Sequence, residues 1–187
     1  MERGAAQAAG LEIGVRPQFP KNWGLTPILL LAALSLPAAA AGYDANGVAL
    51  GATEAEVRKG FPSAHCRALE WKSAAAERRC DDAQVVVAGA RARVTFYLKG
   101  DRVQAFDVRF EERDLKRVTE ELKKRYGAPL AESRDSFARR EGEARTITKV
   151  RWEKGEERAV LTSQEKRKRV DLNVWRGSFD EEIYRVR

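Results

Sequence analysis

Apolar residues recur at helical spacing in the stretch Glu112–Tyr126. Leu115, Val118, Leu122 and Tyr126 follow one another at intervals of three or four positions, so they form one apolar stripe on a helix. A glycine and then a proline come within three residues of this stripe, which is typical of a helix C-terminus. The pattern therefore predicts an amphipathic helix that packs its stripe on a core.

A shorter helix is predicted to begin after Thr53. Thr53 and Glu56 have the spacing of a capping box, in which each side chain accepts a hydrogen bond from the other residue's backbone N–H. Pro62 follows shortly, and the residue before a proline disfavours the helical conformation. We expect Val57 and Phe61 to supply the inner face of this helix.

Alternating apolar residues predict strands over most of the remaining chain. Such alternation buries one face of a strand and leaves the other solvated. Lys99–Arg102 has the composition of a tight hairpin turn, and charged or glycine-containing turns separate the later segments, as in an antiparallel meander. The tail 179–187 is predicted to be a short helix or a frayed end. The predicted strands are 47–51, 84–88, 90–98, 102–110, 133–140, 144–152, 158–163 and 169–175.

The order of these elements is helix, strands, helix, strands, which indicates an α+β fold rather than a parallel βαβ arrangement. We expect an antiparallel sheet covered by helices on one face. The halves 46–111 and 112–187 each begin with a helix that is followed by an aromatic residue, a proline and antiparallel strands. This similarity suggests two tandem helix–strand repeats within one domain, 42–187.

Residues 1–41 have the pattern of a secretory signal peptide with a long N-terminal region. Lys21 precedes the uncharged apolar run Leu25–Leu36, and an alanine tract follows at A-x-A spacing. Cleavage there would leave a mature chain that begins at Ala41 or Gly42. The competing interpretation is an uncleaved membrane anchor, since 25–41 approaches the length that spans a bilayer. The preferred interpretation predicts a periplasmic or secreted protein.

Cys66 and Cys80 are the only cysteines, and an even count in an exported chain predicts one disulfide. We expect this bond to close a surface loop with a helical turn, between the first helix and the first pair of strands. A metal site that adds His65 and the pair Asp81–Asp82 is the alternative. It is disfavoured because adjacent residues of an extended chain point in opposite directions. The prediction is a disulfide, with no metal or cofactor.

The sequence carries 35 Lys and Arg against 28 Asp and Glu, a formal charge of +7. Residues 1–41 hold three of these cations and two of the acids, so the basic character belongs to the remainder. Such a charge attracts anionic partners. Its sharpest feature is the run Lys166, Arg167, Lys168 and Arg169, a candidate anion-binding turn. The competing interpretation is a solvated turn whose charges keep a sheet edge from aggregating.

Other candidate chemistry in the sequence is sparse. The single histidine, His65, adjoins a cysteine that we expect to be oxidised, so a histidine-activated nucleophile is disfavoured. Phosphate-binding and zinc-protease motifs are missing from the sequence, and export argues against a nucleic-acid partner. Trp71 lies among charged residues between the cysteines and is a candidate interface residue. These observations predict a protein that is not an enzyme.

Several segments together resemble small exported bacterial proteins with the β-lactamase-inhibitor-like fold. This fold is shared with the small-protein-A (outer-membrane assembly lipoprotein E-like) superfamily. The resemblance implies protein–protein contact in the cell envelope, although the cysteine that would carry a lipid anchor is missing. Its motifs concern glycine, proline and apolar positions, so they bear on fold more than on activity. The segments are Leu50–Val57, Phe61–Pro62, Leu122–Pro129 and the strand around Trp152.

Two functions follow as hypotheses. The first is a non-enzymatic envelope protein that binds another protein, as an assembly factor or an inhibitor. The alternative is binding of an anionic lipid surface or polysaccharide through the basic turn Lys166–Arg169. Salt would separate the two, because added ions screen exposed charges and weaken binding to an anionic surface.

Overall fold

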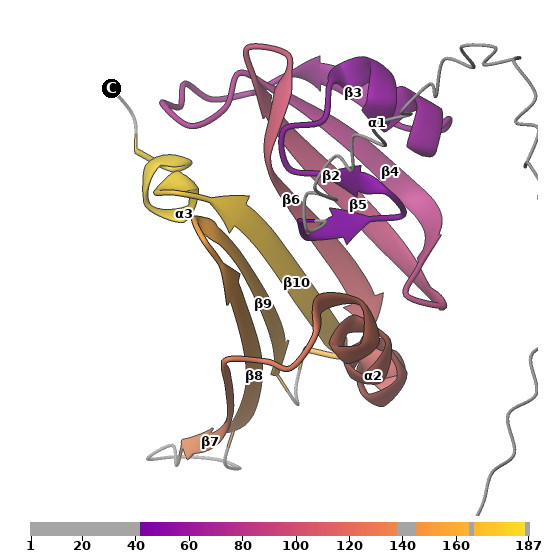
Figure 1. Cartoon of the computed structure of the whole chain (residues 1–187), viewed down its shortest axis with the longest axis vertical. Helices are drawn as coiled ribbons and strands as arrows, with labels where there is room; N and C mark the ends of the chain where they lie inside the picture. The colour runs from indigo at the N-terminus through magenta and orange to yellow at the C-terminus, as the bar shows by residue number, and fades with distance from the viewer. Residues whose placement is uncertain (1–41, 138–144, 165–166, 186–187) are drawn as a thin grey trace, which may run out of the picture. The chain divides into compact units, whose positions relative to one another are not determined.

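The computed structural model describes residues 42–137, 145–164 and 167–185. The predicted signal peptide, 1–41, lies outside the described residues. In the described part, eight strands form one antiparallel sheet in the order β3-β4-β5-β6-β10-β9-β8-β7 (Figure 1). The strands are β3 (His65–Ala68), β4 (Arg78–Val87), β5 (Ala90–Lys99), β6 (Arg102–Glu111), β7 (Ala131–Phe137), β8 (Arg145–Lys154), β9 (Glu157–Gln164) and β10 (Arg169–Arg176).

The prediction of an α+β fold with helices covering the sheet was wrong. Helices make up only 19% of the described residues, and the fold is largely β. The cause is that strands take up far more of the described residues than helices do, and the described helices are too short and too few to cover eight strands. The helices are α1 (Glu54–Gly60), α2 (Leu115–Tyr126) and α3 (Phe179–Glu182), with a 3-10 turn η1 (Glu112–Asp114) before α2; a small hairpin pairs β1 (Asp44–Ala45) with β2 (Val48–Ala49).

Two four-stranded meanders meet in the middle of the sheet. In each half of the chain a helix precedes four antiparallel strands, α1 before β3–β6 and α2 before β7–β10. The halves join through their last strands, β6 and β10, which pair in antiparallel register from Arg169 opposite Glu111 to Trp175 opposite Ala105. This order places β6 and β10, the paired strands that lie farthest apart in the sequence, at the centre of the sheet. Duplication of one ancestral unit stays a prediction.

One face of the sheet carries the main core. Alternating residues of β5, β6, β10, β9 and β8 point into it, and α1, α2 and the β1–β2 hairpin pack on them. Val118 and Leu122 of α2 are fully buried, with Leu115 and Tyr126 partly buried beside them, so the predicted stripe is confirmed. The sheet supplies Ala92, Val94, Phe96, Phe106, Val108, Phe110, Val150, Trp152, Ala159, Leu161, Val170, Leu172 and Val174 to this core.

The local signals for the first helix and the first hairpin are also confirmed. Thr53 is the N-cap of α1, and its hydroxyl and the Glu56 carboxylate form the reciprocal capping box. In the turn between β5 and β6, Gly100 and Asp101 both have positive φ values, 54° and 60°. This left-handed conformation at both positions matches the twist of the flanking strands.

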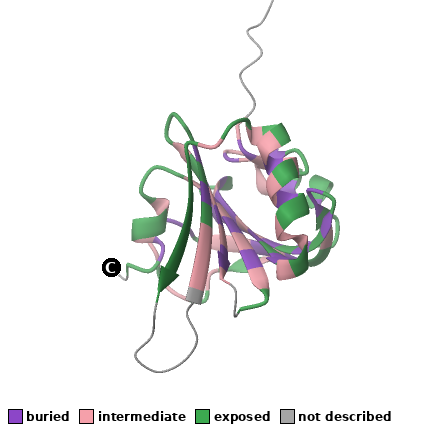
Figure 2. Cartoon of the chain, turned by 90° about the horizontal axis from the view of Figure 1, so that it is seen from below, coloured by how far each residue is buried: buried purple, intermediate pink, exposed green. Residues whose placement is uncertain are grey.

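The opposite face of the sheet is covered at one end only. There the segment 69–77 and α3 pack on Tyr97 and Ala105 of the sheet, and Ile183 completes a second, small apolar cluster. Figure 2 shows the sheet between the larger helices on one side and α3, next to the C-terminus, on the other. The remainder of this face stays open to solvent and carries the features described next.

Candidate functional site

The disulfide between Cys66 and Cys80 is confirmed, but its position differs from the prediction. The two residues lie directly opposite each other on β3 and β4, not on a loop. Cys80 is fully buried in the main core. His65, beside Cys66, is exposed on the short edge strand. The bond therefore ties the edge of the sheet to its neighbour.

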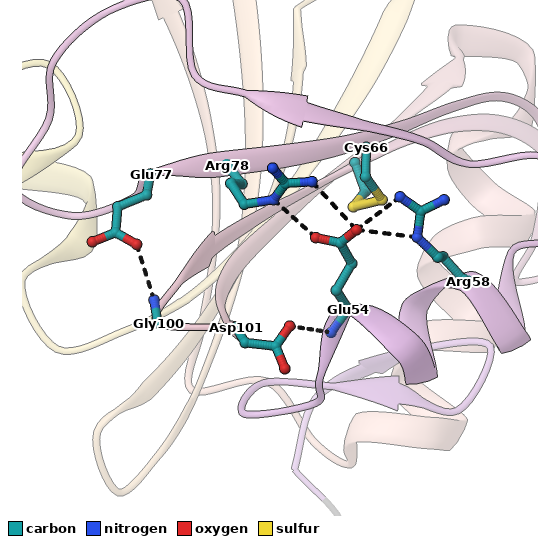
Figure 3. Close-up of polar contacts among 8 residues, drawn as sticks. Glu54, Arg58, Cys66, Glu77, Arg78, Gly100 and Asp101 are labelled. Carbon is teal, nitrogen blue, oxygen red and sulfur yellow. Dashed lines mark hydrogen bonds and ion pairs between the residues drawn. A yellow bond between two sulfur atoms is a disulfide. The ribbon is translucent and has the colours of Figure 1, made fainter.

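A carboxylate lies beside this disulfide. One Glu54 carboxylate oxygen and the two sulfurs lie within 4.8 Å of one another, a spacing that would suit a metal ion if the sulfurs were thiolates (Figure 3). They are bonded to each other, and Glu54 instead accepts hydrogen bonds from Arg78 (Nε, 2.9 Å) and Arg58 (Nη2, 2.7 Å). These two guanidinium groups lower the pKa of Glu54. The cluster joins α1 to β4 and serves the fold.

The predicted basic run lies at the turn before β10. Lys166 is outside the described residues. Arg167 and Lys168 are exposed in the turn, whereas Arg169 is half-buried and its Nε lies 3.0 Å from an Asp171 oxygen. Lys168 and Arg169 face a groove, so part of this run joins a larger basic surface.

We call this surface the basic groove. It is a hollow of about 670 Å³ at one end of strands β4, β5, β6 and β10. Strand pairing places Arg93 next to Arg109, and Arg109 next to Asp171, on the face opposite the main core. Its lining residues are Ala83, Gln84, Val85, Val86, Arg91, Ala92, Arg93, Arg109, Phe110, Glu111, Lys168 and Arg169.

The charges of the basic groove are only partly neutralised. Asp171 contacts both Arg109 (3.0 Å) and Arg169. Among the described residues, no carboxylate forms an ion pair with Arg91 or Arg93, which are both exposed. Two guanidinium groups with free donors therefore project from the same face of β5, two positions apart. Sequence reasoning found the turn but missed these arginines, because exposed charges on an alternating strand are ordinary.

Trp71, the candidate interface residue, packs against the C-terminal segment. Its ring is half-buried and stacks on Tyr184 with the ring centroids 6.0 Å apart. Its Nε1 donates a hydrogen bond of 3.0 Å to the Ile183 carbonyl. The indole therefore fixes the segment around α3 onto the sheet. A role in partner binding stays a prediction.

A pocket of about 290 Å³ lies beneath α3, and we call it the α3 pocket. At its floor the Asp107 carboxylate accepts hydrogen bonds from Asn173 Nδ2 at 2.7 Å and from the Tyr97 hydroxyl at 3.2 Å. These three polar residues come from β6, β10 and β5, which are neighbours in the sheet. The remaining lining residues are Ala105, Val160, Val174, Trp175, Phe179, Asp180, Ile183 and Tyr184.

Burial raises the pKa values of both Asp107 and Tyr97. Loss of hydration raises the pKa of Asp107, and the hydrogen bonds from Asn173 and Tyr97 partly oppose that rise. Burial and the adjacent Asp107 charge raise the pKa of the Tyr97 phenol, so this hydroxyl stays protonated at neutral pH and donates. The sequence analysis did not single out Asp107 or Asn173. An isolated acid or amide on the polar side of a strand carries no distinctive pattern.

Strands β6 and β10 carry both the α3 pocket and the basic groove on the open face of the sheet. Along β6, Ala105 and Asp107 line the α3 pocket, while Arg109 and Glu111 line the basic groove. Along β10 the order is the same, with Trp175 and Asn173 followed by Arg169. An acidic, aromatic pocket and a basic groove therefore adjoin on this face.

Comparison of the chain with protein-family models, with curated proteins and with solved structures found no match. Among the described residues, no helix has the length and apolar character needed to cross a membrane. The disulfide is consistent with a location outside the cytoplasm. Function is therefore argued from the open face itself.

Proposed function

We propose that this chain is a non-enzymatic binding protein of the cell envelope that holds an acidic segment of another protein in the basic groove. The observation that carries the proposal is the pair Arg91 and Arg93, whose guanidinium groups have no acidic partner among the described residues. Unpaired arginines on neighbouring positions attract carboxylates at long range and bind them with charge-assisted hydrogen bonds.

The shape of the groove favours a protein segment over a membrane surface. A lipid bilayer is contacted best by cations on a protruding surface, whereas these cations line a hollow. The lining also contains apolar side chains, and Val86 is 60% exposed there. An extended peptide with alternating acidic and apolar residues matches both properties, because its apolar side chains would bury Val86.

Location outside the cytoplasm is part of the proposal. The signal-peptide pattern of residues 1–41 supports a periplasmic or secreted protein, and a disulfide is stable in such a compartment. We also propose the relation to the exported bacterial proteins named above, on the pattern of glycine, proline and apolar residues alone. The partner would then be another envelope protein.

The test is binding of a fluorescent peptide that alternates glutamate and leucine, measured by anisotropy over a range of salt concentrations. The variant Arg91→Glu/Arg93→Glu reverses the two unpaired charges. Lys59→Glu/Arg134→Glu is the matched control, since both residues are exposed and lie on α1 and β7, away from the groove. Loss of binding in the first variant alone supports the proposal.

Vesicles of phosphatidylcholine with a minority of phosphatidylglycerol provide the competing outcome. Binding to the vesicles without binding to the peptide would replace the proposal by the anionic-surface alternative through Lys166–Arg169. Equal loss in both double variants would reduce the effect to net charge and overturn the proposal.

A further inference from the structure

We propose that the α3 pocket binds an organic cation, specifically an alkylammonium group, with Asp107 as the counter-charge. The inference is independent of the proposed function, because it rests on the pocket and not on the basic groove. Three observations support it: an acid with only neutral partners, a wall of aromatic rings, and a volume that fits a small group.

The first observation concerns the partners of Asp107. Its two carboxylate oxygens accept hydrogen bonds from neutral donors, Asn173 and Tyr97. The nearest arginine on the same strand, Arg109, is in an ion pair with Asp171 at 3.0 Å and points into the basic groove. Among the described residues, Asp107 takes part in no ion pair. A desolvated carboxylate of this kind is stabilised by a cation, and the pocket gives a ligand access to it.

The second observation concerns the aromatic side chains of the wall. Tyr97, Trp175, Phe179 and Tyr184 all line the pocket. Aromatic faces attract ammonium groups through their quadrupole, and a cage of such rings is a recurrent site for quaternary ammonium ligands. The combination of an acid at the floor and rings at the wall selects a cation with an apolar surface.

The rings of this wall are held in place by neighbouring side chains. Tyr97 and Phe179 are in contact with their ring centroids 5.5 Å apart. Tyr184 is 74% exposed but stacks on Trp71, whose indole N–H is anchored on the Ile183 carbonyl. The wall is therefore formed before a ligand arrives, which lowers the ordering cost of binding.

The third observation is the size of the pocket. Its volume of about 290 Å³ lies at the lower end of small-molecule sites. An ammonium head group or the end of a lysine side chain fits this space, whereas a large ligand does not. Both sources present the same chemistry, so two probes are needed to distinguish them.

The test is a titration followed by the amide signals of β6 and β10 in heteronuclear NMR spectra. Choline represents a small quaternary ammonium ligand, and Nα-acetyl-lysine N-methylamide, whose ε-ammonium group is free, represents a protein side chain. 3,3-Dimethylbutan-1-ol is the neutral control, because it has the shape of choline without the charge. We expect saturable shifts with choline or the lysine derivative and none with the alcohol; the tighter of the two cations identifies the source.

The variant Asp107→Asn removes the charge and keeps the size of the side chain. We expect it to lower the affinity for the cation about tenfold or more, as loss of a buried charge partner does. Asp135→Asn, an exposed residue of β7, changes the net charge equally and should leave the affinity unchanged. Tyr184→Ala removes an exposed ring of the pocket wall, and we expect a roughly two- to fivefold loss.

Three outcomes would overturn the inference. The first is the absence of saturable shifts with both cations. The second is binding of the neutral alcohol as tight as that of choline, which would make the pocket merely apolar. The third is an Asp107→Asn variant that is folded, as judged by its spectrum, and binds the cation as the parent does.

Discussion

At the scale of single residues, the burial of Asp107 has a cost for the folded state. Its pKa is raised in the fold above the ordinary value of 3.8, chiefly by burial. The protonated form is therefore favoured in the folded state, and the ionised form at neutral pH reduces stability.

This property gives a prediction for Asp107→Asn. Below the ordinary pKa of 3.8, Asp107 is neutral in the folded and unfolded states, so the difference in unfolding free energy between variant and parent is constant. As the pH rises through the raised pKa, the parent loses stability relative to the variant. We expect the variant to gain stability relative to the parent as the pH rises above 3.8 and the difference to level off once the raised pKa is passed, as measured by urea unfolding over that range.

Other groups near Asp107 do not alter the sign of this effect. Burial is the largest effect on the pKa of Asp107, so the hydrogen bonds from Asn173 and Tyr97 and the charge of Arg109, which lower that pKa, do not reverse its rise. A difference in stability that is independent of pH would contradict the raised pKa.

Glu54 has the opposite pH dependence. Hydrogen bonds from Arg78 and Arg58 lower its pKa below the ordinary 4.5, so its contribution to stability is present above that pH and is lost as the pH falls through the lowered pKa. We expect Glu54→Gln to cost about 1 kcal/mol at neutral pH, given partial exposure. Glu120→Gln, on the exposed side of α2, should cost almost nothing. Equal costs for the two variants in thermal unfolding would contradict this role.

At the scale of elements, α2 depends on its buried stripe. Leu122 is fully buried, and Leu122→Ala should lower the unfolding free energy by about 2–5 kcal/mol, because it removes packed methyl groups and leaves a cavity. Lys116→Ala, on the exposed side of the same helix, should change it by less than about 0.5 kcal/mol. Chemical denaturation measures both, and two equally mild effects would show that α2 does not pack on the sheet.

The edge strand β3 depends on the disulfide. Cys66 and Cys80 are separated by 14 positions, and closing such a loop stabilises a protein by about 3 kcal/mol in the chain-entropy model. We expect a reducing agent to lower the melting temperature while most of the strand signal in circular dichroism remains. The variant Cys66→Ser/Cys80→Ala should melt at the same temperature with and without the reducing agent. Loss of the whole sheet on reduction would contradict an edge role.

The sequence predicted those elements whose signal is local. The stripe of α2 and the capping box at Thr53 each lie within a few consecutive residues, and both are confirmed. The predicted loop between the cysteines is present only over residues 69–77 and contains no helical turn. Strand β3 and the first half of β4 were not predicted, because that half of β4 is rich in charges and shows no clear alternation. That half is held by pairing with β5 and by ion pairs such as Arg79 with Asp81 at 2.9 Å, which no local pattern displays.

At the scale of the whole molecule, neither the fold class nor the site could be found from local patterns. The sequence indicated antiparallel strands but did not show that the two groups of strands join into one sheet of eight. The prediction of an α+β fold therefore assigned too large a part of the structure to the helices. The α3 pocket combines Tyr97, Asp107 and Asn173, which meet only because β5, β6 and β10 are neighbours. Its chemistry depends on pairing between distant strands.

The central pairing gives a prediction for truncated chains. Arg109 and Asp171 lie 62 positions apart and form an ion pair across β6 and β10. A chain that ends before Arg169 lacks β10, so the two meanders have no shared strand pair. We expect it to show no cooperative unfolding transition, whereas a chain that ends after Arg185 should unfold cooperatively. Cooperative unfolding of the shorter chain would mean that one half folds alone.

The place of β10 at the centre of the sheet also fixes an order of events during synthesis. A nascent chain contains β6 long before it contains β10, so the middle of the sheet stays incomplete until almost the whole chain has left the ribosome. Distant strand pairing is slow to form in any case. The polypeptide therefore remains without its final fold for most of its synthesis, which is the condition that the proposed export would require.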